Sequence, residues 1–130
     1  MATYPPKNDS NIDGTFSWQN TVNLQHWLKA RGVYAKAREC DGAWGYWTTL
    51  GIQTYLRQRT FPDGTRYYAG QLDGQFGSMT KKAMGDAAGY LLSVGGVNYM
   101  YGLCSAYSCT VSWPSTSVVK QWQHFLNANT

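Results

Sequence analysis

Apolar side chains recur at helical spacing in four stretches of the chain, which are separated by polar, glycine-rich segments. Apolar positions three to four residues apart are typical of amphipathic helices. The stretches predicted as helices are 18–31, 46–59, 78–92 and 115–127. The side chains expected to face inward are Val22, Leu24, Trp27, Leu28, Trp47, Leu50, Ile52, Tyr55, Leu56, Met79, Ala83, Met84, Ala87, Leu91, Val118, Val119, Trp122, Phe125 and Leu126. The pattern therefore predicts an all-α fold.

Two of the helix starts share one local pattern, in which an Asp-Gly pair precedes an aromatic residue, a second glycine and then a threonine. Asp-Gly favours a tight turn, because Gly accepts a positive φ and the Asp side chain can accept a hydrogen bond from the backbone ahead of it. The residues of the two copies are Asp41, Gly42, Trp44, Gly45 and Thr48, and Asp73, Gly74, Phe76, Gly77 and Thr80. We interpret them as structural turns that place an aromatic side chain in the core.

A second echo lies inside the predicted helices. The sequence apolar-Gln-x-aromatic-Leu occurs at 24–28, 52–56 and 122–126. A shared core-facing pattern explains this repetition, so we take it as evidence about the fold alone.

The two ends of the chain differ from its middle. Residues 1–17 contain Pro5-Pro6 and a polar, turn-rich segment, and they are predicted to form a linker or a disordered end. Residues 18–130 are expected to form a single domain with a core at 18–92 and an extension at 93–130, in which 93–114 is irregular. No signal peptide is expected at the start of the chain, and no apolar run approaches the roughly 18–20 residues that span a membrane.

The composition indicates a compact domain with aromatic side chains to spare for its surface. Aromatic residues make up 15% of the chain and charged residues 14%, against a usual charged fraction of ~25%. The formal net charge is +4. Basic residues concentrate between 29 and 66, which suits either a solvated face or an anionic partner.

The three cysteines leave two arrangements open. Cys104 and Cys109 bracket a short loop and are able to form a disulfide in an oxidising compartment, which would leave Cys40 unpaired. The sequence does not decide between this bridge and three free thiols.

Residues for catalysis or metal binding are sparse. Glycoside cleavage by paired carboxylates needs two acids at a set distance, and Glu39 is the single glutamate of the chain. A Cys–His site would have to combine Cys40 with His26 or His124, which occupy equivalent positions of two predicted helices. Neither a metal site nor a cofactor is expected. Basic residues interleaved with Tyr and Trp keep a nucleic-acid-binding domain as an alternative, although no recognition signature is present.

In order, the motifs resemble the peptidoglycan-binding domain of cell-wall hydrolases. The resemblance covers about residues 18 to 92 and rests on the segment 22–28, on Gly32 and on the two Asp-Gly turns. It implies a small three-helix bundle, no catalytic centre, and binding to peptidoglycan or another anionic cell-wall polymer. Residues 93–130 lie outside the family pattern, either as an extension whose additional C-terminal helix packs on the bundle or as the start of a second, incomplete repeat. Gly51, where the family usually has Ala, and the long loop 60–72 depart from the family pattern.

The implied role is to anchor a tethered lytic enzyme, of phage or bacterial origin, to the murein. The protein would then be a monomer that reaches the wall after lysis or through a fused partner. The residues expected to contact the ligand are Arg38, Tyr46, Trp47, Arg57, Arg66, Tyr67 and Tyr68, because flat aromatic faces suit sugars and guanidinium groups suit carboxylates or phosphates. A small cell-wall hydrolase with an unrecognised site remains the other alternative.

Overall fold

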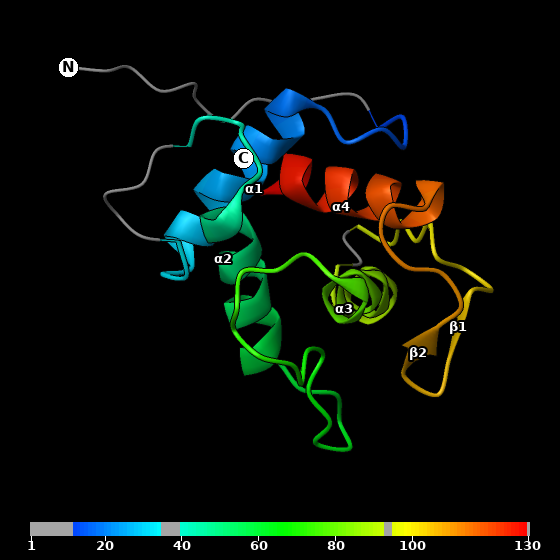
Figure 1. Ribbon diagram of the computed structural model, residues 1–130. Coiled ribbons are helices and arrows are strands. Elements are labelled where there is room, and N and C mark those ends of the chain that lie inside the picture. Colours follow the sequence, from blue (N-terminus) through cyan, green and yellow to red (C-terminus); the bar gives the residue numbers. More distant parts are fainter. Residues whose placement is uncertain (1–11, 35–39, 93–94, 130) are drawn as a thin grey trace.

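The computed structural model describes residues 12–34, 40–92 and 95–129. This part of the chain is mostly helical, which confirms the predicted all-α class, and its elements are shown in Figure 1. The helices are α1 (Trp18–Ala30), α2 (Tyr46–Gln58), α3 (Ser78–Tyr90) and α4 (Thr116–Ala128). The strands β1 (Cys104–Ser105) and β2 (Ser108–Cys109) pair as a minimal antiparallel hairpin.

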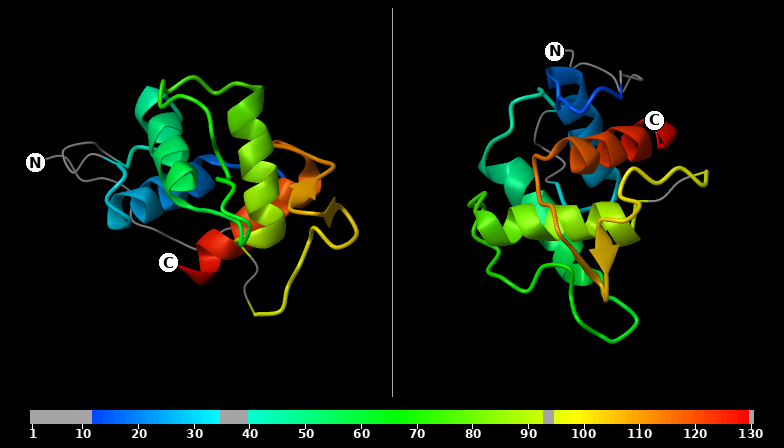
Figure 2. Two further views of the ribbon diagram at one scale, coloured as in Figure 1. Left: turned by 90° about the horizontal axis from the view of Figure 1, so that it is seen from below. Right: turned by 90° about the vertical axis from the view of Figure 1, so that its right-hand side faces the viewer.

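The four described helices pack in a closed ring. Each helix contacts the next one along the chain, and α4 returns to contact α1 (Figure 2). The apolar side of α4 lies in the common core, where Val118, Val119, Trp122 and Leu126 are almost completely buried. The additional C-terminal helix therefore packs on the other helices, as one of the two expectations had it, and closes the core between α3 and α1.

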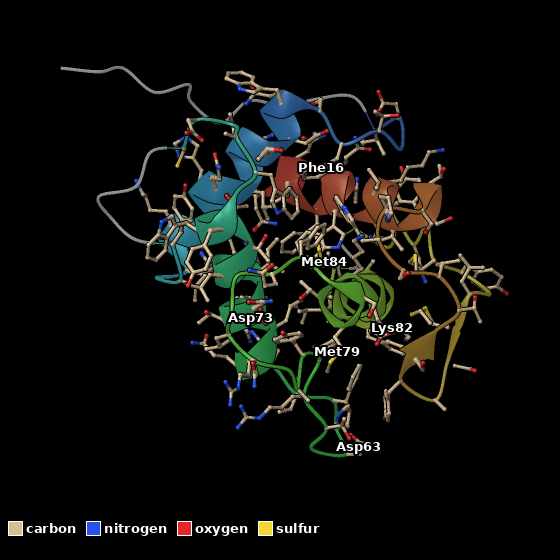
Figure 3. All side chains as sticks on the ribbon, viewed as in Figure 1. Phe16, Asp63, Asp73, Met79, Lys82 and Met84 are labelled. Atoms are coloured by element: carbon tan, nitrogen blue, oxygen red, sulfur yellow. A yellow bond between two sulfur atoms is a disulfide. The ribbon has the colours of Figure 1, made fainter. Side chains whose placement is uncertain are left out.

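An aromatic cluster packed against the core receives one ring from the segment before each helix. Phe16, Trp44, Phe76 and Trp113 precede α1, α2, α3 and α4 in turn. The ring centroids lie 5.8 Å apart for Phe16–Trp44, 5.0 Å for Trp44–Phe76, 4.9 Å for Phe16–Trp113 and 5.6 Å for Trp44–Trp113. Edge-to-face and tilted contacts at these distances are favourable. Phe16 points into the space between α1 and α4 (Figure 3).

A buried glutamine on α1 holds the first predicted Asp-Gly turn. The Oε1 atom of Gln25 accepts a hydrogen bond from the backbone N–H of Gly42 at 2.8 Å. Its Nε2 donates to the carbonyl oxygen of Ala43 at 3.0 Å and to Oγ1 of Thr48 at 3.1 Å. Gly42 has φ +78, which explains the need for glycine at this point. The Gln of the repeated motif is therefore the residue that fixes the turn before the next helix.

Gln53 repeats this arrangement between α2 and the second predicted turn. Its Oε1 accepts from the N–H of Gly74 at 2.9 Å. Its Nε2 donates to the carbonyl oxygen of Gln75 and to Oγ1 of Thr80, both at 3.0 Å. The same side-chain amide thus satisfies the backbone of the turn and the threonine that follows it.

The third glutamine of the repeated motif, Gln123 on α4, holds a further Asp-Gly turn at the start of the described chain. Its Oε1 accepts from the N–H of Gly14 at 3.0 Å, and its Nε2 donates to the carbonyl oxygen of Thr15 at 2.8 Å and to Oδ1 of Asn20 at 3.0 Å. Residues 13–16 spell Asp-Gly-Thr-Phe. The linker expected over 1–17 is therefore wrong for 12–17, which belong to the folded unit.

Gly85 of α3 occupies the position that the glutamines hold in the other three helices, eight residues after the N-cap. A Cβ atom at Gly85 would collide with the carbonyl oxygen of Val111 and lie 3.0 Å from the Cα of Ser112. The chain before α4 thus packs directly on the α3 backbone, where the other junctions use an amide side chain. Each described helix positions the chain entering the next, and α4 positions the chain entering α1.

The hairpin attaches the segment before α4 to α3. Cys104 and Cys109 form a disulfide whose sulfur atoms pack on Gly89, and Cys40 is a buried free thiol. Oδ1 of Asp86 accepts a hydrogen bond from the N–H of Cys109 at 2.9 Å. The disulfide resolves the alternative that the sequence left open.

Candidate functional site

Two aromatic side chains at the first positions of α1 and α2 cover the glycines of the turns that follow those helices. The Trp18 ring lies over Gly42, and its Nε1 donates a hydrogen bond to the carbonyl oxygen of Asp41 at 3.0 Å. The Tyr46 ring lies over Gly74 in the same way. Both side chains nevertheless remain about half exposed, at 54% for Trp18 and 49% for Tyr46. Each ring therefore packs with one side on the backbone of a turn, and its other side is exposed to solvent.

Trp47 extends this surface. Its ring lies edge-on to Tyr46 with centroids 5.1 Å apart, and its side chain is 39% exposed. We refer to the exposed rings of Trp18, Tyr46 and Trp47 together as the aromatic strip. Tyr46 and Trp47 are in contact, and exposed large apolar side chains that gather mark binding sites more often than isolated ones do. Of these three, Tyr46 and Trp47 were expected from the sequence, whereas Trp18 was not.

Tyr67 and Tyr68 lie mainly in the core, although they were expected to be surface contacts. Their exposed fractions are 9% and 4%. The loop folds back on the end of α2, where the N–H of Tyr67 donates to the carbonyl oxygen of Arg59 and that of Tyr68 to the carbonyl oxygen of Leu56. Burial raises the pKa of the Tyr67 phenol. A ligand therefore reaches these residues only at their edges.

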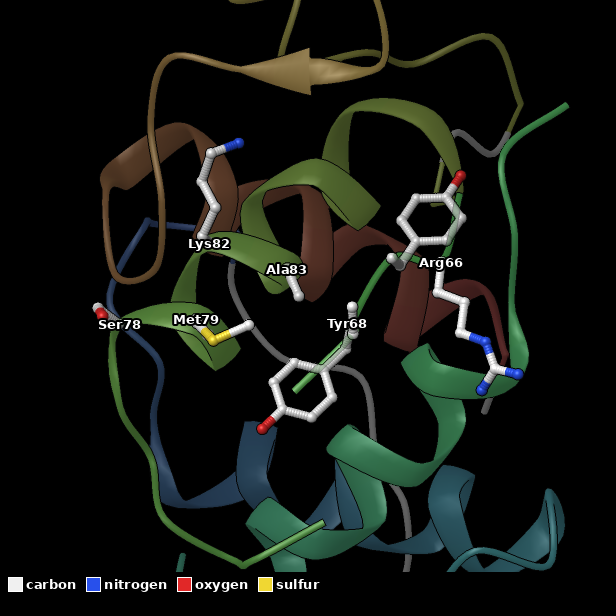
Figure 4. A pocket seen from close by; sticks show the side chains of 8 residues that line it. Arg66, Tyr68, Ser78, Met79, Lys82 and Ala83 are labelled. Carbon is white, nitrogen blue, oxygen red and sulfur yellow. The ribbon is translucent and has the colours of Figure 1, made fainter. Parts of the chain in front are cut away.

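The edges of both tyrosines line a hollow of about 400 Å³ beside α3, within the usual size range of ligand pockets. We call it the α3 hollow; its lining is Arg66, Tyr67, Tyr68, Ala69, Ser78, Met79, Lys82 and Ala83. Arg66 and Lys82 stand at opposite ends, with Tyr68 and Met79 between them (Figure 4). Met79 is exposed here, so its expected inward position is wrong.

A second hollow, of about 410 Å³, lies beside the end of α2. We call it the α2 hollow; its lining is Thr54, Arg57, Gln58, Thr60, Arg66 and Leu72. The structure thus brings together Arg57 and Arg66, two of the basic residues expected to contact a ligand. Nη1 of Arg66 donates to the carbonyl oxygen of Arg57 at a long 3.4 Å.

The remaining predicted residues have other positions or roles. Arg38 lies outside the described residues. Oδ1 of Asp41 accepts from the N–H of Ala43, and Oδ1 of Asp73 accepts from the N–H of Gln75, both at 3.0 Å. The backbone of Gln75 and the amide of Gln53 lower the pKa of Asp73. A lowered pKa is the opposite of what a general acid needs, so Asp73 acts as a turn residue.

The free thiol is equally poorly suited to catalysis. Burial raises the pKa of Cys40, whereas a nucleophilic cysteine needs a lowered one. Within 12–34, 40–92 and 95–129, no three His, Cys, Asp or Glu side chains come together in a way that could hold a metal ion.

Sequence reasoning missed Trp18, Leu72 and Lys82 as surface residues near the expected contacts. Trp18 had a recognisable signal, since it follows Ser17, the N-cap of α1, just as Tyr46 follows Gly45, the N-cap of α2. Leu72 and Lys82 carried no such signal, because their positions depend on how the loop 60–72 folds against α3.

Comparison of the chain with protein families, with curated proteins and with solved structures finds no match. None of the helices in the described part of the chain has the length and apolar character needed to cross a membrane.

Proposed function

We propose that this protein binds peptidoglycan without cleaving it. The observation that carries the proposal is the aromatic strip of Trp18, Tyr46 and Trp47, three large aromatic side chains that are 54%, 49% and 39% exposed. The C–H faces of sugar rings pack well on aromatic rings, and Tyr and Trp add polar atoms that accept or donate hydrogen bonds at the rim. The glycan strands of peptidoglycan present a row of such faces.

The support beneath the strip favours a binding role. Trp18 and Tyr46 rest on Gly42 and Gly74, and each of those turns is fixed by a buried glutamine. A ligand that stacks on these rings meets side chains that are already held in place, so binding costs less conformational entropy. The resemblance of the turn motifs to peptidoglycan-binding domains points to the same ligand.

The biological role that follows is anchoring of a lytic enzyme. A binding module tethered to a catalytic partner raises the effective concentration of that partner at the wall, even when the module alone binds weakly. The function proposed for this chain is therefore to hold such an enzyme on murein.

The test is a pull-down with purified murein sacculi at low salt, comparing the wild-type protein with Trp47→Ala. Trp47 is chosen because it is partly exposed and because the rings that lie over Gly42 and Gly74 are those of Trp18 and Tyr46. We expect the apparent Kd to rise at least tenfold, since an anchoring aromatic side chain at an interface contributes about 2 kcal/mol or more.

The matched control is Tyr101→Ala, which removes the most exposed aromatic side chain of the described residues, at 88%, from a segment on the other side of α3 from α2 (Figure 1). Its binding should equal that of the wild type. Wild-type protein that stays in the supernatant would refute the proposal, as would equal losses in both variants. Release of reducing ends or a fall in turbidity would refute the absence of cleavage.

A further inference from the structure

The α2 hollow and the α3 hollow meet at Arg66, which lines both. We propose that together they form a groove that binds the stem peptide of peptidoglycan, with a peptide carboxylate held by Arg57 and Arg66. This inference rests on the proposed function and deepens it, because it assigns the glycan to the aromatic strip and the peptide to the groove.

The charge of the groove favours an anionic occupant. Arg57 and Arg66 are both exposed and share the α2 hollow. Among the residues that the structure describes, the only ion pair joins Lys82 Nζ to Asp86 Oδ1 at 2.6 Å. Neither Arg57 nor Arg66 has a carboxylate partner among these residues. Two like charges on one hollow repel each other until an anion arrives, and a guanidinium fork matches the two oxygens of a carboxylate.

The apolar part of the lining favours a peptide over a wall polymer of polyol phosphate. Leu72 is exposed beside the two arginines in the α2 hollow, and Met79 is exposed in the α3 hollow. Methyl-bearing side chains such as those of alanine would gain from burial against these groups. A polyol phosphate offers no such apolar surface. A peptide therefore fits both parts of the lining, because its carboxylate suits the arginines and its methyl groups suit Leu72 and Met79.

The groove continues toward the aromatic strip. A third hollow, of about 380 Å³, is lined by Tyr68, Ser78 and Met79 from the α3 hollow and by Asp73 and other residues of the second predicted turn. The Tyr46 ring lies over Gly74 of that same turn. A glycan strand on the strip would thus have its peptide branches within reach of the groove.

The first experiment titrates the protein, observed by NMR, with a synthetic stem pentapeptide that ends in D-alanine. We expect chemical-shift changes at Arg57, Arg66 and Leu72, and a loss of affinity of at least fivefold for the C-terminal amide of the same peptide. Arg57→Gln combined with Arg66→Gln should abolish the shifts. Arg31→Gln, which removes an exposed guanidinium at the end of α1, is the matched control and should bind like the wild type.

Circular dichroism of each variant confirms that it is folded. Equal affinity for the acid and the amide, or equal binding by the double variant, would overturn the inference. Displacement of the peptide by poly(glycerol phosphate) at an equal concentration of charge would also overturn it, because the site would then bind any anion regardless of its peptide part.

A second experiment separates this inference from the proposed function. Sacculi are treated with an amidase that removes the stem peptides and leaves the glycan strands. If the wild type binds intact sacculi at least threefold more tightly than peptide-free ones, and the Arg57, Arg66 double variant loses this difference, the peptide assignment holds. Equal binding to both materials overturns the assignment of the stem peptide to the groove but leaves the proposal of wall binding standing. No binding to either material refutes the proposed function itself.

Discussion

Gln53 is the residue whose replacement tests most directly how the ring of helices is held together. The substitution Gln53→Leu keeps the approximate volume of the side chain and removes its polar atoms. In the wild type, Oε1 accepts from the N–H of Gly74 at 2.9 Å. The two N–H groups of Nε2 face four acceptors: Tyr68 Oη at 3.2 Å, Asp73 Oδ1 at 3.1 Å, and Gln75 O and Thr80 Oγ1 at 3.0 Å.

The expected loss follows from the number of protons available. Two donated bonds and one accepted bond amount to three hydrogen bonds, and each contributes about 1 kcal/mol net. Gln53 is completely buried, so its former partners do not all regain water, which adds to the loss. We therefore expect the free energy of unfolding to fall by about 3 to 4 kcal/mol, a large fraction of the roughly 5–15 kcal/mol typical of a domain.

Urea unfolding followed by circular dichroism at 222 nm measures this change. The matched control is Gln58→Leu, which makes the same chemical change at an exposed position of the same helix and should alter stability by less than about 0.5 kcal/mol. The pKa of Asp73, measured by NMR, should rise in Gln53→Leu because the Gln53 amide helps to lower it. A loss below 1 kcal/mol with an unchanged Asp73 pKa would show that the buried amide does not hold the turn.

Three further results are expected. Gly85→Ala should destabilise the protein by about 1–3 kcal/mol, as in other overpacked cores, because the new methyl group meets the backbone before α4; a gain in stability in a thermal melt would contradict that contact. Phe16→Ala should lower the unfolding free energy by about 2–3 kcal/mol, since its ring packs on Trp44 and Trp113; a wild-type urea midpoint would show that Phe16 lies outside the fold. Hydrogen bonds to Asp13 and Asp73 lower the pKa of both carboxyl groups, so their contribution is complete above the ordinary value near 3.9 and is lost as the pH falls through the lowered values. Stability measured from pH 5 to pH 2 should therefore fall, and it should fall less steeply when both are replaced by Asn.

The helices could be predicted from the sequence because their signal is local. Apolar periodicity and the turn residues before α2 and α3 place all four described helix starts within one residue of the expected position. The repeated apolar-Gln-x-aromatic-Leu pattern was also visible. Its meaning was not, because the partner of each glutamine lies in a turn before a different helix, as with Gln123 and Gly14.

The turn before α1 escaped recognition because two of its positions differ from the other copies. Ser17 stands where the others have Gly, and Asn20 stands where they have Thr. The structure explains both changes, since Ser17 and Asn20 form a reciprocal capping box at the start of α1. A search that allowed any N-cap residue at the first position would have found this turn.

The candidate site was predicted less well, because exposure depends on tertiary packing. Tyr67 and Tyr68 belong to a loop, yet backbone hydrogen bonds to α2 turn them into the core. Met79 has helical spacing toward the core, yet it lies in the first turn of α3, where its side chain is exposed and lines the α3 hollow. Arg57 and Arg66 were expected to contact a ligand on the basis of composition and resemblance. That they line one hollow could not be predicted, because it depends on how the loop 60–72 folds.

The hydrogen bonds between Gln123 and the turn at 13–15 also bear on the order of folding during synthesis. They join residues more than 100 positions apart, with sequence separations of 108 to 110. A nascent chain can form the contacts from α1 to α2 and from α2 to α3 as it grows, but the turn before α1 has no partner until α4 has left the ribosome. Contacts this distant in sequence slow folding, because the loop must close before they form. Closure of the helical ring is therefore a late event that must wait for α4, and protease sensitivity of ribosome-bound chains that stop before α4 would reveal it.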